Sequence, residues 1–138
     1  MKLWNVGIKV GDVSREVEFF ERLGGKTVAR EKRSAAAEDS EYAILEFAGT
    51  RLFITSRPLF EALLSSELRD GLTHIVFESD ELEPQIEAAI ESGATQVMER
   101  RRIVGDFGSR EIAFLRSPGG VIFEVMTIHE NETEAESA

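Results

Sequence analysis

The sequence carries an internal repeat, and this repeat limits the fold more than any other feature. An offset of 69 residues aligns Asn5 with His74 and also aligns Gly24 with Gly93, which end the two amphipathic segments. In both halves an alternating apolar segment is followed by a segment of helical period and then by three further alternating segments. The repeat therefore predicts an α+β fold of two β-α-β-β-β modules.

The predicted elements follow the same order in both modules. Strands are expected over 3–10, 26–33, 41–48 and 50–56 in module one, and over 72–79, 95–104, 109–117 and 120–128 in module two; helices are expected over 13–25 and 82–93. We therefore expect a single domain over 1–128, with module one at 2–56, a connecting helix at 57–70 and module two at 71–128, followed by an acidic flexible tail at 129–138.

The connecting helix and the open faces of the sheets predict where a ligand binds. The helix is expected to pack Phe60, Leu63 and Leu64 inward. Each module covers one face of a small sheet with its own helix and leaves the other face open. The two open faces then form a shared cleft, which is a natural place for a small ligand.

The composition limits the partners of the chain. The 138 residues include 26 Asp and Glu against 16 Lys and Arg, which gives a formal net charge of −10. A field of this sign repels nucleic acid and anionic lipid, so neither a nucleic-acid nor a membrane partner is expected. The sequence has no cysteine, which excludes disulfides and thiolate metal sites. No secretory signal and no long apolar segment stands out, so a cytoplasmic location is expected.

Two polar residues stand among the apolar residues of the predicted strands. His74 lies in the run 72–79, and Glu124 shares one face of its strand with Ile122 and Met126. Each has an ordinary explanation, as a hydrogen-bonded core histidine and as a carboxylate paired with an arginine. An imidazole and a carboxylate on the first and last strands of one module also suit a divalent metal or a proton transfer. The residues alone leave both explanations open.

Three stretches give the sequence a resemblance to a known family. They are the opening LWNVGIKVGDVSREVEFFERLG, the second opening GLTHIVFESDELE and the ending RSPGGVIFEVM. Together with the paired modules, they make residues 2–127 similar to the vicinal oxygen chelate superfamily, which includes glyoxalases, bleomycin-resistance proteins, methylmalonyl-CoA epimerases and extradiol dioxygenases. The resemblance implies a glyoxalase-like fold with metal ligands on the first and last strands of each module. This scaffold hosts both enzymes and pure binding proteins.

Carried over residue by residue, the resemblance implies that His74 and Glu124 are metal ligands, but module one departs from the pattern. Asn5 stands where a histidine is usual, and Phe53 or Ile54 stands where a carboxylate is usual. An amide oxygen is a weak donor to transition metals. Asn5, His74 and Glu124 are therefore expected to form a degenerate metal site, with at most a weakly bound divalent metal as cofactor.

Two functions from different classes follow from this departure. The first is a small-molecule-binding protein of the glyoxalase or bleomycin-resistance type with a degenerate metal site. The alternative is a metal-dependent lyase or isomerase, glyoxalase-like or epimerase-like, in which a divalent cation polarises a substrate oxygen and Glu124, as the catalytic residue, moves a proton. The residues of module one favour the first. A homodimer is also expected, because open sheets often complete their burial across a partner.

Aromatic and basic residues are further candidates for ligand binding. Trp4, Asn5, Phe53 and Phe114 would line the cleft if they face inward, and Phe107 in the turn 105–109 would close over it; core packing and a plain hairpin turn explain the same residues. The run ERRR at 99–102, with Arg30, Lys32 and Arg33, would hold an anionic substrate or pair with surface glutamates. Surface pairing is the favoured interpretation of this run in an acidic protein.

Overall fold

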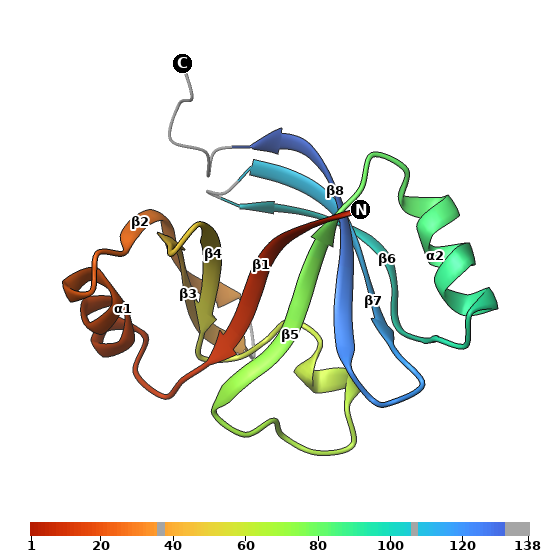
Figure 1. Ribbon diagram of the computed structural model, residues 1–138. Coiled ribbons are helices and arrows are strands. Elements are labelled where there is room, and N and C mark those ends of the chain that lie inside the picture. Colours follow the sequence, from red (N-terminus) through yellow and green to blue (C-terminus); the bar gives the residue numbers. More distant parts are fainter. Residues whose placement is uncertain (36–37, 106–107, 132–138) are drawn as a thin grey trace.

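The computed structural model describes residues 1–35, 38–105 and 108–131, which form one sheet and two helices (Figure 1). The strand order is β2-β3-β4-β1-β5-β8-β7-β6. The strands are β1 (Lys2–Lys9), β2 (Lys26–Ala35), β3 (Glu38–Phe47), β4 (Thr50–Thr55), β5 (Gly71–Glu78), β6 (Thr95–Gly105), β7 (Gly108–Arg116) and β8 (Ile122–Asn131), and the helices are α1 (Val13–Arg22) and α2 (Leu82–Glu91). The order β-α-β-β-β occurs twice, which confirms the predicted α+β fold.

The two modules join through their first strands. β1 pairs with β5 in antiparallel orientation, and each module's first strand pairs in parallel with its own last strand, β1 with β4 and β5 with β8. The sheet curls around these central strands, and α1 and α2 lie outside it at opposite ends (Figure 1). The faces that the helices do not cover therefore turn toward one another.

Alternation along the strands separates the helix-covered core from the concave face. On β7, Ala113 and Leu115 pack in the cluster that contains Ile86 of α2. Ile112 and Phe114, which alternate with them, belong to a different cluster on the other face. Alternate residues along the strand thus point to opposite faces of the sheet, and every second side chain reaches the concave face.

Both helices are shorter at their C-terminal ends than the prediction. The side chain of Asp12 caps the start of α1 by accepting a hydrogen bond from the backbone N–H of Arg15 at 3.0 Å. Gly24 and Gly93 follow the helices with φ of 106° and 108°. This left-handed conformation reverses the chain at little cost only for glycine, so the helices end before these residues.

The connection between the modules differs from the prediction. Within 57–70 the structure has a single 3-10 turn, Glu61–Leu63, where a longer connecting helix was expected. Phe60 is fully buried, as predicted, whereas Leu63 is 54% exposed and so does not pack inward. The helical spacing of a few apolar residues predicted a helix here. It did not predict a 3-10 turn in which Glu61 is buried and Leu63 is exposed.

Glu61 holds this connecting segment against β1. Its Oε2 accepts hydrogen bonds from Lys9 Nζ at 2.5 Å and from the backbone N–H of Leu68 at 3.1 Å. Burial raises the pKa of Glu61, but the hydrogen bonds from Lys9 and Leu68 and the charges of Lys9 and Arg57 outweigh it, so this pKa lies below its ordinary value of 4.5. An ion pair, rather than a helix, therefore fixes the path between the modules.

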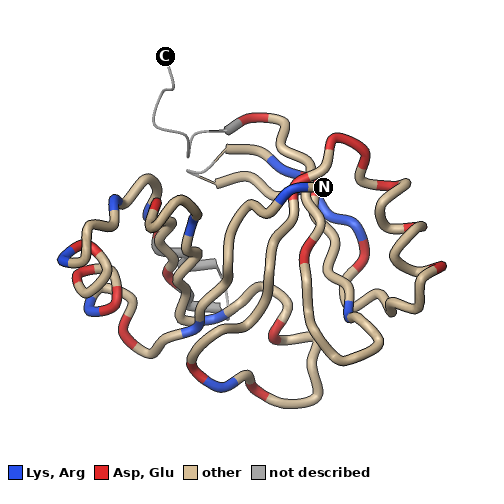
Figure 2. The backbone as a smooth tube through the Cα atoms, viewed as in Figure 1, with Lys and Arg blue, Asp and Glu red and all other residues tan. Residues whose placement is uncertain are grey.

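The outer surface is acidic where α2 lies. Glu83, Glu87 and Glu91 follow one another along this helix, which carries no basic residue in its last turn (Figure 2). Among the described residues, neither helix is long and apolar enough to cross a membrane. β8 continues to Asn131, three residues beyond the predicted end of the domain at 128, and residues 132–138 of the expected tail lie outside the described part of the chain.

Candidate functional site

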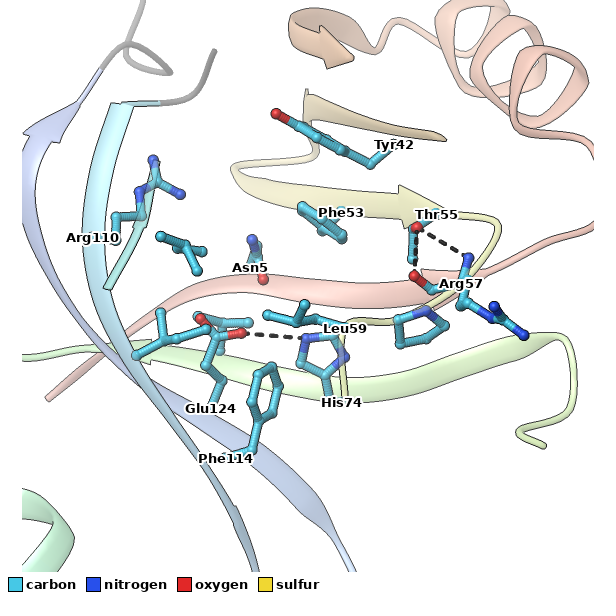
Figure 3. Close-up of a pocket in the computed structure, with 14 residues that line it drawn as sticks. Asn5, Tyr42, Phe53, Thr55, Arg57, Leu59, His74, Arg110, Phe114 and Glu124 are labelled. Carbon is cyan, nitrogen blue, oxygen red and sulfur yellow. Dashed lines mark hydrogen bonds and ion pairs between the residues drawn. The ribbon is translucent and has the colours of Figure 1, made fainter. Parts of the chain in front are cut away.

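The concave face contains a cavity that both modules line (Figure 3). Its volume is about 50 Å³, and its wall is formed by Asn5, Tyr42, Phe53 and Thr55 from module one, by Arg57, Pro58 and Leu59 from the connecting segment, and by His74, Val76, Ile103, Arg110, Ile112, Phe114 and Glu124 from module two. The cavity brings Asn5 together with four other residues that the sequence predicts to bind a ligand or a metal. These are Phe53, His74, Phe114 and Glu124.

His74 and Glu124 meet inside this cavity from the neighbouring strands β5 and β8. His74 Nε2 lies 3.7 Å from Glu124 Oε1, which is longer than a hydrogen bond and is an ion pair only when the imidazole is protonated (Figure 3). On the other side of the ring, Nδ1 lies 3.0 Å from Thr73 Oγ1. If the Thr73 hydroxyl donates to Nδ1, the imidazole is neutral with its Nε2–H directed toward the carboxylate. The predicted proximity of these two side chains is confirmed, while their roles stay predictions.

The imidazole of His74 lies directly over the backbone of Gly7. Gly7 and His74 are paired across β1 and β5. A Cβ atom on Gly7 would lie 2.2 Å from Cε1 and 2.3 Å from Nδ1 of the ring. No real side chain tolerates such distances, so the ring position depends on the absence of a side chain at Gly7.

Asn5 presents an unsatisfied oxygen to the cavity. Its side chain is 4% exposed, and Oδ1 has no hydrogen-bond partner among the described residues. A buried acceptor without a partner costs about 1–3 kcal/mol, and such groups in folded proteins usually have a water, ion or ligand as partner. Asn5 lies beside Glu124 and Phe53 in the cavity, so a donor held there would reach it (Figure 3).

The strand register decides which residue of module one stands in the place of Glu124. In module two Val76 pairs with Glu124, and in module one Gly7, which the repeat aligns with Val76, pairs with Phe53. Phe53 therefore takes the position of the carboxylate and faces the cavity. Ile54, the other residue considered, is fully buried in the core cluster beneath α1.

Arg110 is a cavity residue that the sequence analysis missed. It is 4% exposed and lies on β7, where it alternates in step with Ile112 and Phe114. Burial lowers the pKa of the Arg110 guanidinium to about 10, and the Glu124 carboxylate opposes this shift. Arg110 is thus a cation at neutral pH. The signal that could have found it is the period of two counted back from Phe114, which the sequence analysis had singled out.

Aromatic side chains form part of the wall, but not all the predicted ones. Phe53 stacks on Tyr42 with ring centroids 5.2 Å apart and an interplanar angle of 11°. Phe114 packs against Phe60 at 4.7 Å.

Trp4 does not line the cavity, contrary to the prediction, and Phe107 lies outside the described residues. The register of β1 shifts between Leu3 and Asn5, which removes Trp4 from strict alternation. Trp4 packs in the core, where the guanidinium carbon of Arg51 lies 3.6 Å from its ring centroid.

The basic run of module two remains at the surface. Arg100 has ionic contacts with Glu83 at 2.8 Å and with Glu111 at 3.0 Å. Arg30 of module one contacts Glu41 at 4.0 Å. Neither arginine lines the cavity, so pairing with glutamates describes them better than substrate binding does.

A family model described as a glyoxalase-like domain matches residues 5–126. This match spans most of the chain. The chain belongs to the glyoxalase-like family. Together with the structural neighbours, the match places it in the vicinal oxygen chelate superfamily, as the resemblance of its sequence predicts. A search of curated protein sequences finds no match.

Several solved structures share this glyoxalase-like fold. A hypothetical protein from Bacillus halodurans C-125 is 23% identical, with a TM-score of 0.71 over 94% of this chain and 96% of that chain. The methylmalonyl-CoA epimerase from Mycobacterium tuberculosis is 21% identical, with a TM-score of 0.69 over 94% of this chain and 89% of that chain. A methylmalonyl-CoA epimerase in complex with methylmalonyl-CoA and NH4+ is 19% identical, with a TM-score of 0.66 over 96% of this chain and 97% of that chain. At these identities the likeness shows the fold alone.

The donor set of this glyoxalase-like cavity does not fit a tightly held transition metal. Among the described residues, no three His, Cys, Asp or Glu side chains come together as a metal site. His74 and Glu124 are the two strong donors, and Asn5 adds an amide oxygen. Arg110 already places a positive charge that interacts with Glu124, which disfavours a second cation there. A weakly bound divalent metal stays a prediction.

Proposed function

We propose that this protein binds a small planar molecule in the cavity between its two modules, with no tightly held metal. The observation that carries the proposal is the buried Asn5 amide, whose Oδ1 has no partner among the described residues. Keeping this oxygen unpaired lowers stability, and a bound ligand with an N–H or O–H group would recover the loss. A cost in stability that only a ligand offsets is typical of a binding site.

The walls support a planar ligand. Phe53 and Phe114 enter the cavity from opposite modules, and the Tyr42 ring behind Phe53 keeps it in place by stacking. Aromatic faces bury much apolar area and favour flat partners. The polar atoms of His74 and Glu124 then orient the ligand along the central strands.

Isomerase chemistry is the second candidate, and the His74–Glu124 contact favours it. In this case the Glu124 carboxylate would accept a proton from a carbon next to a carbonyl group of the substrate and return it to the same carbon. The fold shared with methylmalonyl-CoA epimerases adds support. The metal-dependent form of this hypothesis requires a divalent ion. Elemental analysis of protein purified without a histidine tag therefore decides between metal-free binding and a metal-dependent isomerase. A near-stoichiometric divalent metal would reverse the ranking.

The substitution Asn5→Leu tests the binding function. Without ligand, Leu should raise the free energy of unfolding by about 1 kcal/mol, because it removes the unpaired oxygen. A ligand at about 100 times its Kd should stabilise the wild type by about 2.7 kcal/mol and the variant much less. Thermal unfolding with a panel of small aromatic compounds, and NMR shifts at the cavity residues, measure both effects.

The control for this test is Leu3→Ala on the same strand, since Leu3 is 50% exposed and does not line the cavity. It should leave ligand stabilisation unchanged. If no compound of the panel perturbs cavity residues of the wild type, or if Asn5→Leu binds as the wild type does, the proposed function is wrong.

We also propose that the chain forms a homodimer. The sheet is open, with β2 and β6 as its edge strands, and open sheets often complete their burial across a partner. Light scattering at tens of micromolar protein should give twice the mass of one chain. A strict monomer at that concentration would remove this proposal and leave the binding function untouched.

A further inference from the structure

Asn5 and Glu124 lie in one row across the neighbouring strands β1, β5 and β8. Asn5 pairs with Val76 of β5, and Val76 pairs with Glu124 of β8. Paired residues on neighbouring strands point to the same face of a sheet, so the amide and the carboxylate enter the cavity on either side of the Val76 side chain (Figure 3). Neighbouring strands lie about 4.8 Å apart. One small group of a ligand above Val76 can therefore contact both side chains.

Both side chains present oxygen atoms that lack a hydrogen-bond donor. Asn5 Oδ1 is buried without a partner, and within the described part of the chain no group donates a hydrogen bond to the Glu124 carboxylate, which is 11% exposed. The charge of Arg110 already interacts with that of Glu124, so the carboxylate has a counter-charge and needs hydrogens rather than a second cation. Two buried acceptors without donors cost free energy, which an uncharged ligand with two donor hydrogens would recover.

His74 adds a donor beside these two acceptors. The 3.7 Å between its Nε2 and Glu124 Oε1 is too long for a hydrogen bond between them. A lone pair on Nε2 would be repelled by the carboxylate, so the favoured state carries a hydrogen on Nε2, whether the imidazole is neutral or protonated. The other ring nitrogen, Nδ1, has Thr73 Oγ1 as its partner at 3.0 Å. A donor N–H and an acceptor oxygen thus stand next to one another in the cavity wall.

We propose that the ligand is an uncharged planar molecule whose edge carries an NH2 group next to a hydrogen-bond acceptor. Aromatic carboxamides and amino-substituted nitrogen heterocycles have such an edge. One hydrogen of the NH2 group meets Asn5 Oδ1 and the other meets the Glu124 carboxylate, while the acceptor of the ligand takes the hydrogen of His74 Nε2. This inference rests on the small-molecule-binding function proposed above and specifies which groups the ligand must carry.

Other classes of planar ligand fit these three side chains less well. A carboxylate presents only acceptors and would be repelled by Asn5 Oδ1 and Glu124. A single hydroxyl group supplies one hydrogen for two acceptors. An aromatic amine without a neighbouring acceptor leaves the hydrogen of His74 Nε2 without a partner. The apolar rings of Phe53 and Phe114 suit all of these ligands equally, so the polar edge decides among them.

Compounds of one shape test this proposal. Benzamide and acetophenone differ only by NH2 against CH3, and benzoate replaces the NH2 group by a charged oxygen; 2-aminopyrimidine and 2-methylpyrimidine form a second NH2–CH3 pair. In at least one pair the NH2 compound should bind the wild type at least about tenfold more tightly than its CH3 analogue, because it alone can donate to both acceptors. Benzoate should bind more weakly than benzamide. NMR titration at pH 7, with shifts at cavity residues to locate each compound, measures the Kd values.

Variants assign the preference to Asn5 and Glu124. Asn5→Leu should reduce the advantage of the NH2 compound to about threefold or less, because one of its two acceptors is lost. Glu124→Gln keeps the size of the side chain but replaces a charged acceptor by a neutral one, so it should also reduce the advantage. Glu130→Gln is the matched control, because Glu130 is exposed on the same strand as Glu124 and lies outside the cavity. It should leave the preference unchanged.

Each result decides the proposal. If the CH3 analogues bind in the cavity as tightly as the NH2 compounds, or if benzoate binds more tightly than benzamide, the proposal is overturned and the binding function stands. A preference that survives both Asn5→Leu and Glu124→Gln, or that Glu130→Gln also removes, overturns the assignment to these two residues. If none of these compounds perturbs the cavity, this inference fails, and the binding function fails with it only if the wider aromatic panel is also without effect. The comparison of compounds uses the wild type, so it holds even if a variant does not fold.

Discussion

Equivalent positions of the two modules carry different chemistry on the same backbone. On the first strands, Asn5 of module one corresponds to His74 of module two, and on the last strands Phe53 corresponds to Glu124. All four side chains line one cavity. Module two supplies an imidazole and a carboxylate, and module one supplies an amide and an aromatic ring. The two modules thus share one backbone geometry, although the side chains at their equivalent positions differ in chemistry.

The ends of the same first strands show a second difference. Lys9 corresponds to Glu78 in the repeat, and both have an ionic contact. Lys9 is 12% exposed and contacts Glu61, which is 6% exposed, whereas Glu78 is 18% exposed and contacts Lys2, which is 74% exposed. The first pair is desolvated and fastens the connecting segment, but the second reaches solvent. Ion pairs in the two environments differ widely in what they contribute to stability.

The largest effect is expected from breaking the buried pair. Glu61→Gln leaves the Lys9 ammonium buried with the Leu68 carbonyl oxygen, 2.9 Å away, as an acceptor but no counter-charge. The free energy of unfolding should fall by about 3 kcal/mol or more, since a buried charge without its partner is strongly destabilising. Lys2→Gln, at the equivalent end of module two, should cost less than about 1 kcal/mol. Denaturant unfolding of both variants measures the difference, and equal losses would contradict it.

The pH dependence of stability gives an independent check on Glu61. Its pKa in the folded protein lies below the ordinary value of 4.5, so the unfolded chain binds the proton more readily. The resulting stabilisation is therefore fully present above pH 4.5 and is lost as the pH falls through the folded pKa. The wild type should lose stability more steeply than Glu61→Gln in this acidic range. Parallel curves for the two proteins would show that Glu61 does not titrate as the structure indicates.

A second large effect is expected when module one receives the chemistry of module two. The double substitution Asn5→His with Phe53→Glu places two imidazoles and two carboxylates around one cavity, a donor set that suits Zn²⁺ or Ni²⁺. The double variant should bind Ni²⁺ about a hundredfold more tightly than the wild type, or by about 2.8 kcal/mol. Each single variant is a control and should gain less. Metal titration with a competing chelator measures the affinities, and unchanged binding would show that the four positions do not converge on one ion.

An intermediate effect is expected at Gly7, whose equivalent in module two is the buried Val76. Gly7→Ala places a Cβ 2.2 Å from His74 Cε1, so the imidazole must move. The free energy of unfolding should fall by about 2 kcal/mol, which is typical of overpacking, and ligand binding should weaken.

The second substitution His74→Ala tests the cause of this loss. It removes the ring, so in the Gly7→Ala background it should restore much of the lost stability, and the double-mutant cycle should give a coupling of at least about 1 kcal/mol. Additive losses would mean that Gly7 acts on stability without His74.

The parts of the molecule that follow a period could be predicted, and those that depend on three-dimensional register could not. The repeat and its alternation predicted the eight strands and both helices, and the resemblance to the vicinal oxygen chelate superfamily predicted that His74 and Glu124 meet. The same alternation, applied to β7, places Arg110 on the concave face beside Phe114, so this residue was missed although its signal was present. Gly7 gave no signal, because its role appears only when β1 and β5 are paired.

The connecting segment gave a misleading signal. Its leucines suggested a helical face, but the buried ion pair between Glu61 and Lys9 fixes the path instead. These residues are 52 positions apart, and both are charged, so neither periodicity nor hydropathy brings them together. The choice between Phe53 and Ile54 likewise needed the pairing of β4 with β1.

The smallest effect on stability is expected at His74, and it separates a binding residue from a core residue. His74→Leu keeps a side chain of similar size against Phe60 and Phe114, whose rings lie 5.1 and 5.5 Å from the imidazole. It removes the contact with Glu124, but that carboxylate still lies near the charge of Arg110. The free energy of unfolding should therefore change by less than about 1 kcal/mol.

Ligand binding should respond to His74→Leu far more than stability does. The Kd should rise at least about tenfold, because the proposed function requires the imidazole and its contact with Glu124 to orient the ligand. The comparison with Asn5→Leu at the equivalent position of module one sharpens the test: both variants should lose binding, and Asn5→Leu should be the more stable, since Oδ1 of Asn5 has no partner among the described residues while His74 has Thr73 and Glu124. Denaturant unfolding and titration of the same samples give both quantities. A loss of several kcal/mol in His74→Leu with unchanged binding would identify His74 as a structural core histidine, and the polar half of the cavity would then belong to Arg110, Asn5 and Glu124 alone.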